Sequence, residues 1–275
     1  MIGMVMAGGR GSRMAASAAA ATAAKNDGSL PESSPHAADR AAWGEKLLLP
    51  VVSSAASDAG APKPVVSHVI DVLLGSDQID TVVAVVSQSN APLTRRMLWD
   101  KYHNSGNDAD GDDHDDDGGS SRSSNDRSIR IVDSAGAGYS DDLGSAMRHV
   151  LQNRYRGIHS GVFVVSGDMP LLDRGVIASV SARYARGAWT SIVTSREYAG
   201  LWGMSLEYEV VVDGTVCCYT GVSLVDPVVM KPDAHDAVPQ RHAIVDDHRI
   251  AFTLNTVQDY DRLAQHMRRS GIAMP

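Results

Sequence analysis

Cysteine and long apolar segments are both scarce in this sequence. The two cysteines among its 275 residues, Cys217 and Cys218, are adjacent. They cannot join distant segments, so a disulfide framework is excluded, and this usage is typical of a reducing compartment. No apolar run approaches the roughly 20 residues that a membrane span needs, and the N-terminus does not resemble a signal peptide. The sequence therefore predicts a cytoplasmic protein without a membrane span.

A surplus of basic residues is absent as well. The formal net charge is −8 at pH 7, which argues against a general binder of nucleic acids or anionic membranes. Much of the negative charge comes from eight aspartates in residues 104–127. Their spacing does not fit a calcium-binding loop, because Asp113 stands where the invariant glycine belongs. We interpret 104–127, and the alanine- and serine-rich residues 15–42, as flexible insertions in one domain that spans 1–275.

Short β-branched runs alternate along the chain with segments whose apolar residues recur at helical spacing. Strands are expected at residues 2–6, 81–86, 129–132, 162–165, 190–194 and 250–255. Helices are expected at 64–74, 92–103, from a cap at Ser140, from Asp173 to about Ala185, and after a capping box formed by Thr256 and Asp259. Residues 207–225 have the pattern of a hairpin around Asp213-Gly214. The alternation predicts an α/β fold, a Rossmann-like, doubly wound and mostly parallel (mixed) sheet.

The first predicted strand ends in the glycine-rich stretch AGGRGSRM, residues 7–14. Glycines at such a point leave backbone N–H groups free to bind phosphate, and Arg10 and Arg13 add positive charge. The stretch is not a Walker loop, because no Gly-Lys-Ser/Thr follows, and it is not a dinucleotide fingerprint, because Met14 replaces the third glycine. A tight strand-to-helix turn is the alternative interpretation. The two arginines favour a phosphate site.

Two further candidates follow from the expected sheet, since ligands bind at the carboxyl ends of its strands. Asp168, in the sequence SGDMP, comes directly after a predicted central strand. A carboxylate there is suited to Mg²⁺, which needs only one or two protein ligands besides phosphate oxygens; the alternative is a loop or helix cap. Lys46 is a cation that follows the glycine-rich stretch, and on its own it would be an ordinary surface lysine.

These motifs resemble those of the nucleotidyltransferases that join a nucleoside triphosphate to a phosphate, such as sugar nucleotidyltransferases and molybdenum cofactor guanylyltransferases. Within that group the chain is most similar to the archaeal adenosylcobinamide-phosphate guanylyltransferases. The discriminating stretch is GAGYSDDL, residues 136–143, which is similar to that family's G-x-G-Y-x-x-D-L. Asn90, the stretch 219–222 and Asn255 also match. The chain departs from the family at Leu47, where a proline is usual, and at Ser223, where an asparagine is usual, and Lys63-Pro64 could compete for the role of Lys46.

The resemblance implies transfer of GMP from GTP to adenosylcobinamide phosphate, with Mg²⁺ as cofactor and pyrophosphate as by-product, in cobalamin biosynthesis. It implies that the substrates are GTP and a corrinoid phosphate and that nucleic acid is not a partner, and it leaves a monomer and a homodimer both open. The implied site residues are the backbone of Ala7, Gly8, Gly9 and Gly11 for phosphates, Arg10, Arg13 and Lys46 for pyrophosphate, Asp168 for Mg²⁺, Asn90 for guanine, and Gly138 and Gly221 for close approach of nucleotide or corrinoid.

Two alternatives remain open. A molybdenum cofactor guanylyltransferase would be expected to have a Gly-Pro-Leu type loop where this chain has Gly136-Ala137-Gly138-Tyr139. A nucleotide-binding regulator without catalysis would have no need for Arg13, Lys46 and Asp168 together. Trp189, Tyr198 and Trp202 either form an apolar lip for a bulky acceptor or pack in the core.

Overall fold

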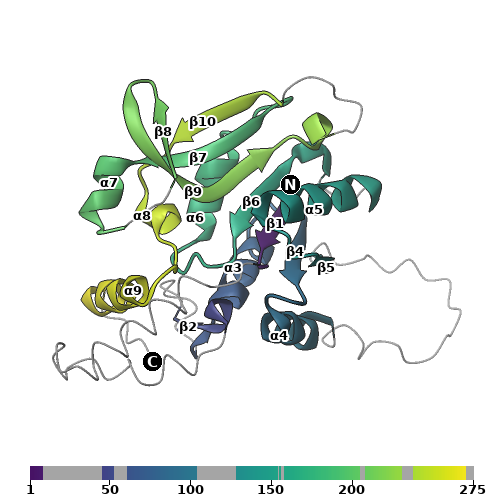
Figure 1. Cartoon of the computed structure of the whole chain (residues 1–275), viewed down its shortest axis with the longest axis horizontal. Coiled ribbons are helices and arrows are strands. Elements are labelled where there is room, and N and C mark those ends of the chain that lie inside the picture. The colour runs from purple at the N-terminus through teal and green to yellow at the C-terminus, as the bar shows by residue number, and fades with distance from the viewer. Residues whose placement is uncertain are drawn as a thin grey trace, which may run out of the picture.

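The computed structural model describes residues 1–8, 45–52, 61–103, 128–153, 155, 158–204, 208–230 and 238–270. This part of the chain forms one eight-stranded sheet flanked by helices (Figure 1), which confirms the expected α/β class. The strand order is β10-β7-β9-β6-β1-β4-β5, and β8 pairs with β9. The strands are β1 (Ile2–Met6), β4 (Thr81–Ser87), β5 (Ser128–Ser134), β6 (Val162–Ser166), β7 (Trp189–Ser195), β8 (Glu209–Val212), β9 (Thr215–Val225) and β10 (Gln240–Ile244). A separate pair joins β2 (Pro50–Val51) to β3 (Lys63–Pro64).

Strands β1, β4, β5 and β6 form a parallel core. Both faces of this core are covered. Helices α3 (Val65–Leu74), α4 (Pro92–His103) and α6 (Arg174–Ser181) contribute to a large apolar cluster with Val5, Val82 and Phe163, whereas α5 (Tyr139–Asn153) packs into a second cluster with Ile2 and Met4. Burial on two faces explains why these strands are continuous apolar runs and why the sequence predicts them.

Strand β9 is antiparallel to both of its neighbours, β6 and β7. It begins in a hairpin with β8, whose two-residue turn has positive φ at Asp213 (48°) and Gly214 (81°). Such a turn matches the right-handed twist of the flanking strands. The hairpin predicted at 207–225 is therefore confirmed, although residues 205–207 lie outside the described part of the chain.

The C-terminal part differs from the expectation. The predicted strand at 250–255 is wrong: residues 248–251 form α8 (His248–Ala251), and 252–255 run without regular structure. The Asp247 carboxylate caps α8 by accepting a hydrogen bond from the backbone N–H of Arg249 at 2.9 Å. The outer strand is instead β10, at residues that the sequence pattern did not indicate.

Helix boundaries are mostly as predicted. Helix α4 has the expected bounds, and α9 (Val257–Arg269) begins with the predicted capping box of Thr256 and Asp259. Two expectations are wrong: α5 begins at Tyr139, so that Ser140 lies within its first turn, and α6 ends at Ser181 rather than near Ala185. The remaining short elements are η1 (Lys46–Leu48), η3 (Ile158–Ser160), α7 (Arg196–Leu201) and η4 (Pro227–Met230).

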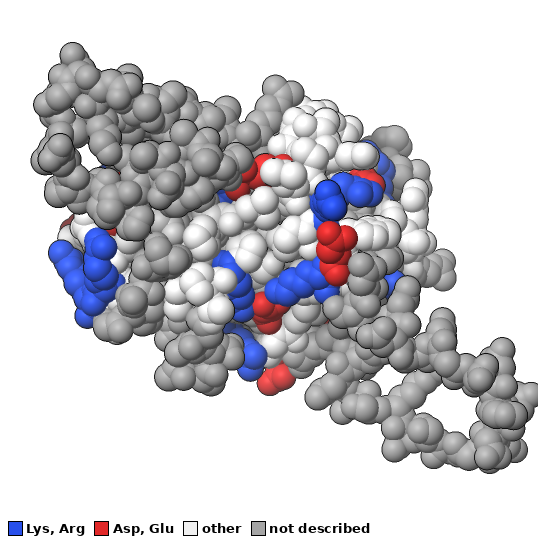
Figure 2. Space-filling view, turned by 90° about the horizontal axis from the view of Figure 1, so that it is seen from below, with Lys and Arg blue, Asp and Glu red and all other residues white. Residues whose placement is uncertain are grey.

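The insertions predicted at 15–42 and 104–127 lie outside the described residues, and the interpretation of 1–275 as one domain stays a prediction. None of the described helices combines the length and the apolar character that crossing a membrane requires. On the face shown in Figure 2, basic and acidic side chains lie close together near the centre rather than in one broad area of a single sign.

Candidate functional site

A cavity of about 1030 Å³ opens at the carboxyl edge of the parallel core. Six of the residues selected from the sequence line it: Gly8, Lys46, Asn90, Gly138, Asp168 and Gly221. Ala7 is buried at the end of β1, where its N–H donates to the carbonyl of Val85 at 2.8 Å. Gly9, Arg10, Gly11 and Arg13 lie outside the described residues, so their roles stay predictions.

An ion pair lines the cavity between its two ends, next to the carboxyl end of β6. The Nζ of Lys46 lies 2.5 Å from Oδ2 of Asp168 and 3.2 Å from Oδ1 of Asn255. The two charged side chains are only 14% and 5% exposed, so solvent screens their attraction less than it would at the surface. Ser166 donates from its Oγ to Oδ1 of Asp168 at 2.5 Å. The sequence motifs assign no role to Asn255 or Ser166, although the first precedes the capping box and the second stands two residues before Asp168.

The competing lysine, Lys63, lies elsewhere. Its Nζ donates to Oδ2 of Asp71 at 2.8 Å, and Tyr102 donates to the other oxygen of the same carboxylate. Burial acts to raise the pKa of Asp71, but these hydrogen bonds outweigh burial and hold the pKa below its ordinary value. Lys63 does not line the cavity. Of the two lysines, Lys46 is therefore the one placed to meet a ligand there.

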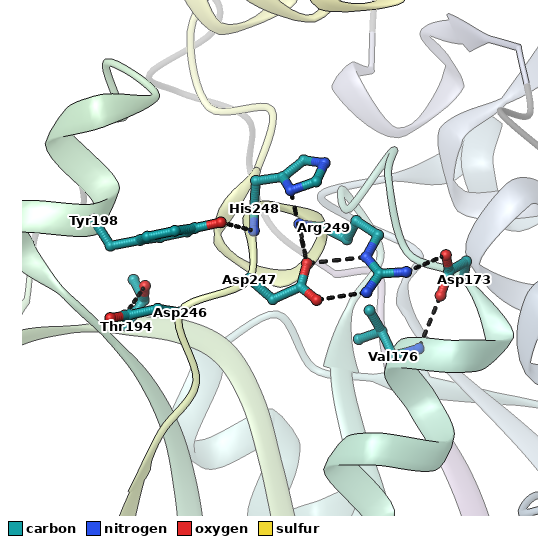
Figure 3. A network of polar contacts seen from close by, with 8 residues as sticks. All are labelled: Asp173, Val176, Thr194, Tyr198, Asp246, Asp247, His248 and Arg249. Carbon is teal, nitrogen blue, oxygen red and sulfur yellow. Dashed lines mark hydrogen bonds and ion pairs between the residues drawn. The ribbon is translucent and has the colours of Figure 1, made fainter. Parts of the chain in front are cut away.

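Arg249 joins the segment that follows Asp168 to the segment that precedes Asn255, because it binds both Asp173 and Asp247 (Figure 3). Arg249 donates to Asp173 at 2.7 Å and, with two nitrogens, to Asp247 at 3.0 and 2.6 Å. Asp173 also caps α6 by accepting from the N–H of Val176. The chain after Asp168 is thus tied to the chain before Asn255, and the N–H of residue 254 donates to the carbonyl of Asp168 at 3.0 Å.

One end of the cavity is formed by the loop between β5 and α5. The side-chain N–H₂ of Asn90 donates to the carbonyl of Gly136 at 3.1 Å, and the N–H of Gly136 donates to Oδ1 of Asp142 at 3.0 Å. A Cβ at Gly136 would lie 2.3 Å from Nδ2 of Asn90, so this close approach requires glycine. By contrast, a Cβ at Gly138 would meet nothing within 4 Å. The hydrogen bonds to Asn90 and Asp142 fix the loop at Gly136, and the space beside Gly138 is open.

A second end of the cavity, lined by residues of β7, β9 and β10, is uncharged and aromatic. Its aromatic lining residues are Trp189, Tyr208 and Tyr219, and Tyr208 is 72% exposed. Among the described residues that line this end from β7, β9 and β10, none is charged. Tyr198 and Trp202 do not line the cavity: the hydroxyl of Tyr198 accepts from the N–H of His248, and Trp202 stacks on the His248 ring at 4.4 Å between centroids.

The carboxylates that line the cavity decide which kind of Mg²⁺ site the protein could form. Nowhere in the described ranges do three His, Cys, Asp or Glu residues gather in a way that could hold a metal ion. Mg²⁺ is commonly held by one or two carboxylates together with substrate phosphates and water. A site in which Asp168 is the single protein carboxylate fits that arrangement. A metal centre built wholly from protein carboxylates does not match the described residues.

Comparisons with known proteins address the fold. No protein-family model matches the chain, and no curated protein matches its sequence. It is similar to the solved structure of a Bacillus anthracis protein described as a glucose-1-phosphate thymidylyltransferase, with 14% identity, 98% of this chain and 96% of the other covered, and a TM-score of 0.54. It is also similar to 4-diphosphocytidyl-2C-methyl-D-erythritol synthase, with 12% identity, 95% and 97% covered, and a TM-score of 0.52. The chain therefore shares the fold of these two structures. At these identities, the likeness to nucleotidyltransferases concerns the fold alone.

Proposed function

We propose that this chain is a nucleotidyltransferase that transfers GMP from GTP to adenosylcobinamide phosphate and releases pyrophosphate. The observation that carries the proposal is the position of the Lys46–Asp168 pair in a cavity at the carboxyl edge of the sheet. A cation and a carboxylate at this place suit a reaction whose substrates and products are phosphates. Gly8, the last described residue of the stretch predicted to bind phosphate, lines the same cavity.

The proposed chemistry needs positioning and charge neutralisation rather than a general base. A phosphate acceptor is already ionised at neutral pH and can attack the α-phosphorus of the triphosphate in line, with pyrophosphate leaving. No histidine is found among the described residues that line the cavity. Lys46 would neutralise charge on the leaving pyrophosphate, with Arg10 and Arg13 in the same role. Asp168 would hold Mg²⁺, which when bound supplies further charge neutralisation.

The two ends of the cavity suit the two substrates. Asn90 would contact the guanine through its side-chain amide, and the open space at Gly138 admits the nucleoside. The uncharged aromatic end, with Trp189 and Tyr219, suits a bulky acceptor whose single phosphate points towards Lys46. The volume of about 1030 Å³ is at the upper limit for the site of one small ligand, roughly 300–1,000 Å³, which is enough for the nucleotide.

The test is pyrophosphate release by the purified protein with Mg²⁺ and each of the four ribonucleoside triphosphates, with and without adenosylcobinamide phosphate. Release with GTP plus the corrinoid alone supports the full proposal. The assay is repeated with a molybdopterin acceptor, and release in that mixture alone would support a nucleotidyltransferase and refute the corrinoid as its acceptor. GTP binding without release in any mixture would favour the regulator. Lys46→Met should abolish release, whereas the matched control Lys63→Met should not, since Lys63 lies outside the cavity.

A further inference from the structure

Glu45 precedes the lysine of the ion pair and makes a contact that the proposed chemistry does not use. Its backbone is extended (φ −100°, ψ 127°). The two carboxylate oxygens accept hydrogen bonds from the backbone N–H groups of Leu93 and Thr94, each at 2.7 Å. These N–H groups belong to the first turn of α4. Glu45 therefore caps a helix that begins 47 residues further along the chain, at Pro92.

Helix α4 has no local substitute for this cap. The residue before it is Ala91, which has no polar side chain, and its first turn contains no acidic residue. The first N–H groups of a helix have no partner within the helix and carry partial positive charge. A carboxylate that accepts from two of them forms charge-assisted hydrogen bonds, which are stronger than neutral ones. The segment that carries Lys46 is thus fixed to α4.

The start of α4 is also fixed to the loop between β5 and α5, which forms one end of the cavity. Directly before Ala91, Asn90 donates from its side chain to the carbonyl of Gly136, and the N–H of Gly136 donates to Asp142. The N–H of Ala91 itself donates to the carbonyl of Ser87 at the end of β4. A continuous series of short contacts therefore runs from the ion pair, through Glu45 and the start of α4, to the loop between β5 and α5.

We propose that Glu45 is a positioning residue that sets the distance between Lys46 and the Asn90–Gly136 contact. The proposal rests on the proposed function, in which Lys46 faces the phosphates and Asn90 faces the base of one nucleotide. A nucleotide that must touch both Lys46 and Asn90 needs them at one fixed spacing, and a displacement of about 1 Å can cost roughly 100-fold in rate. Glu45 supplies that spacing without touching the substrate.

The experiment separates positioning from simple helix capping. Glu45→Ala removes both the cap of α4 and the link, that is, the connection between α4 and the segment that carries Lys46. Adding Ala91→Ser to Glu45→Ala restores a local cap, because a serine before the first helical residue accepts from the same N–H groups, but it does not restore the link to Lys46. Glu197→Ala, which removes an exposed glutamate from the first turn of α7, is the matched control.

Three readouts are compared: urea unfolding, kcat and KM for the nucleotide, and hydrogen exchange of the amides at 136–142. We expect Glu45→Ala to lower the unfolding midpoint, to reduce kcat/KM by about 10- to 100-fold and to speed exchange at 136–142. Ala91→Ser should recover the midpoint but neither of the other two readouts. Glu197→Ala should keep the wild-type kcat/KM and exchange.

Recovery of kcat/KM and of exchange together with the midpoint would overturn the proposal, because Glu45 would then be only a cap. Should the wild-type protein transfer no nucleotide at all, the proposed function fails, and exchange at 136–142 alone decides on the link. Faster exchange that Ala91→Ser does not correct supports the link, and unchanged exchange in Glu45→Ala refutes it.

Discussion

A buried histidine should make the stability of this protein depend on pH between about 6.5 and 4. His68 lies on α3 and is 3% exposed. Its Nε2 donates to the carbonyl of Leu172 at 3.0 Å, and its Nδ1 has no hydrogen-bond partner among the described residues. Burial, aided by the positive charge of Lys63, lowers the pKa of His68 to about 4, against the opposing effects of the Leu172 hydrogen bond and of Asp71 and Asp173.

The direction in which stability changes with pH follows from the number of protons that each state binds. The folded state, with the lower pKa, binds fewer protons than the unfolded state, whose histidine has a pKa of about 6.5. Above pH 6.5 both states are neutral at this residue, and His68 costs nothing. As the pH falls from 6.5 to 4, the unfolded state gains a proton and the folded state does not, so the free energy of unfolding decreases. At 1.36 kcal/mol per pKa unit the full loss is about 3 kcal/mol, of which about 2 kcal/mol is reached at pH 5.

The assay is urea unfolding of the wild-type protein and of His68→Gln at pH 7 and pH 5. Glutamine retains an N–H donor for the carbonyl of Leu172 but does not titrate. The wild-type protein should lose about 2 kcal/mol more than the variant between the two pH values, because the carboxylates titrate in both. His159→Gln, which changes an exposed histidine, should behave like the wild-type protein. Equal losses in wild type and His68→Gln would refute the reasoning.

Three further perturbations test the site and the fold. Asp168→Asn should reduce pyrophosphate release by at least about 100-fold in a protein that still folds, whereas the exposed Asp100→Asn should leave the rate unchanged; wild-type rates in Asp168→Asn would remove that residue from the mechanism. Thr256→Ala should cost about 1 kcal/mol in urea unfolding, since it removes half of the capping box of α9, and an unchanged midpoint would contradict that role. Deletion of residues 104–127 should leave the rate of pyrophosphate release near normal, and a folded but inactive deletion variant would show that the segment is functional.

The sequence predicts the parallel core well because the signal there is local. Strands β1, β4 and β6 are buried on both faces, so nearly every residue in them is apolar. Strand β10 gives no such signal, since it lies at the edge of the sheet, pairs with β7 alone and includes exposed positions. Residues 250–255 resemble a strand in composition. Their conformation is decided instead by contacts from outside the segment, among them the ion pair of Arg249 with Asp173, 76 residues away.

The candidate site is likewise predictable from the sequence only in part. Lys46 and Asp168 could be selected singly, from residue type and from position after a strand. That they form a pair, and that Asn255 joins them, depends on contacts across 122 and 209 residues, which no local pattern reports. The link from Glu45 to the first turn of α4 is of the same kind, because a carboxylate that caps a distant helix has no recognisable spacing in the sequence.

The position of β9 has a consequence for the order in which the sheet is assembled during synthesis. Strand β7 leaves the ribosome before β9, yet its sheet partners are β9 and β10, both of which are made later. Until residue 225 has emerged, β6 presents an unpaired edge and β7 has no place in the sheet. Unpaired edges in incomplete chains invite association with other chains. Between translation of β6 and of β9 the nascent chain is therefore open to such association.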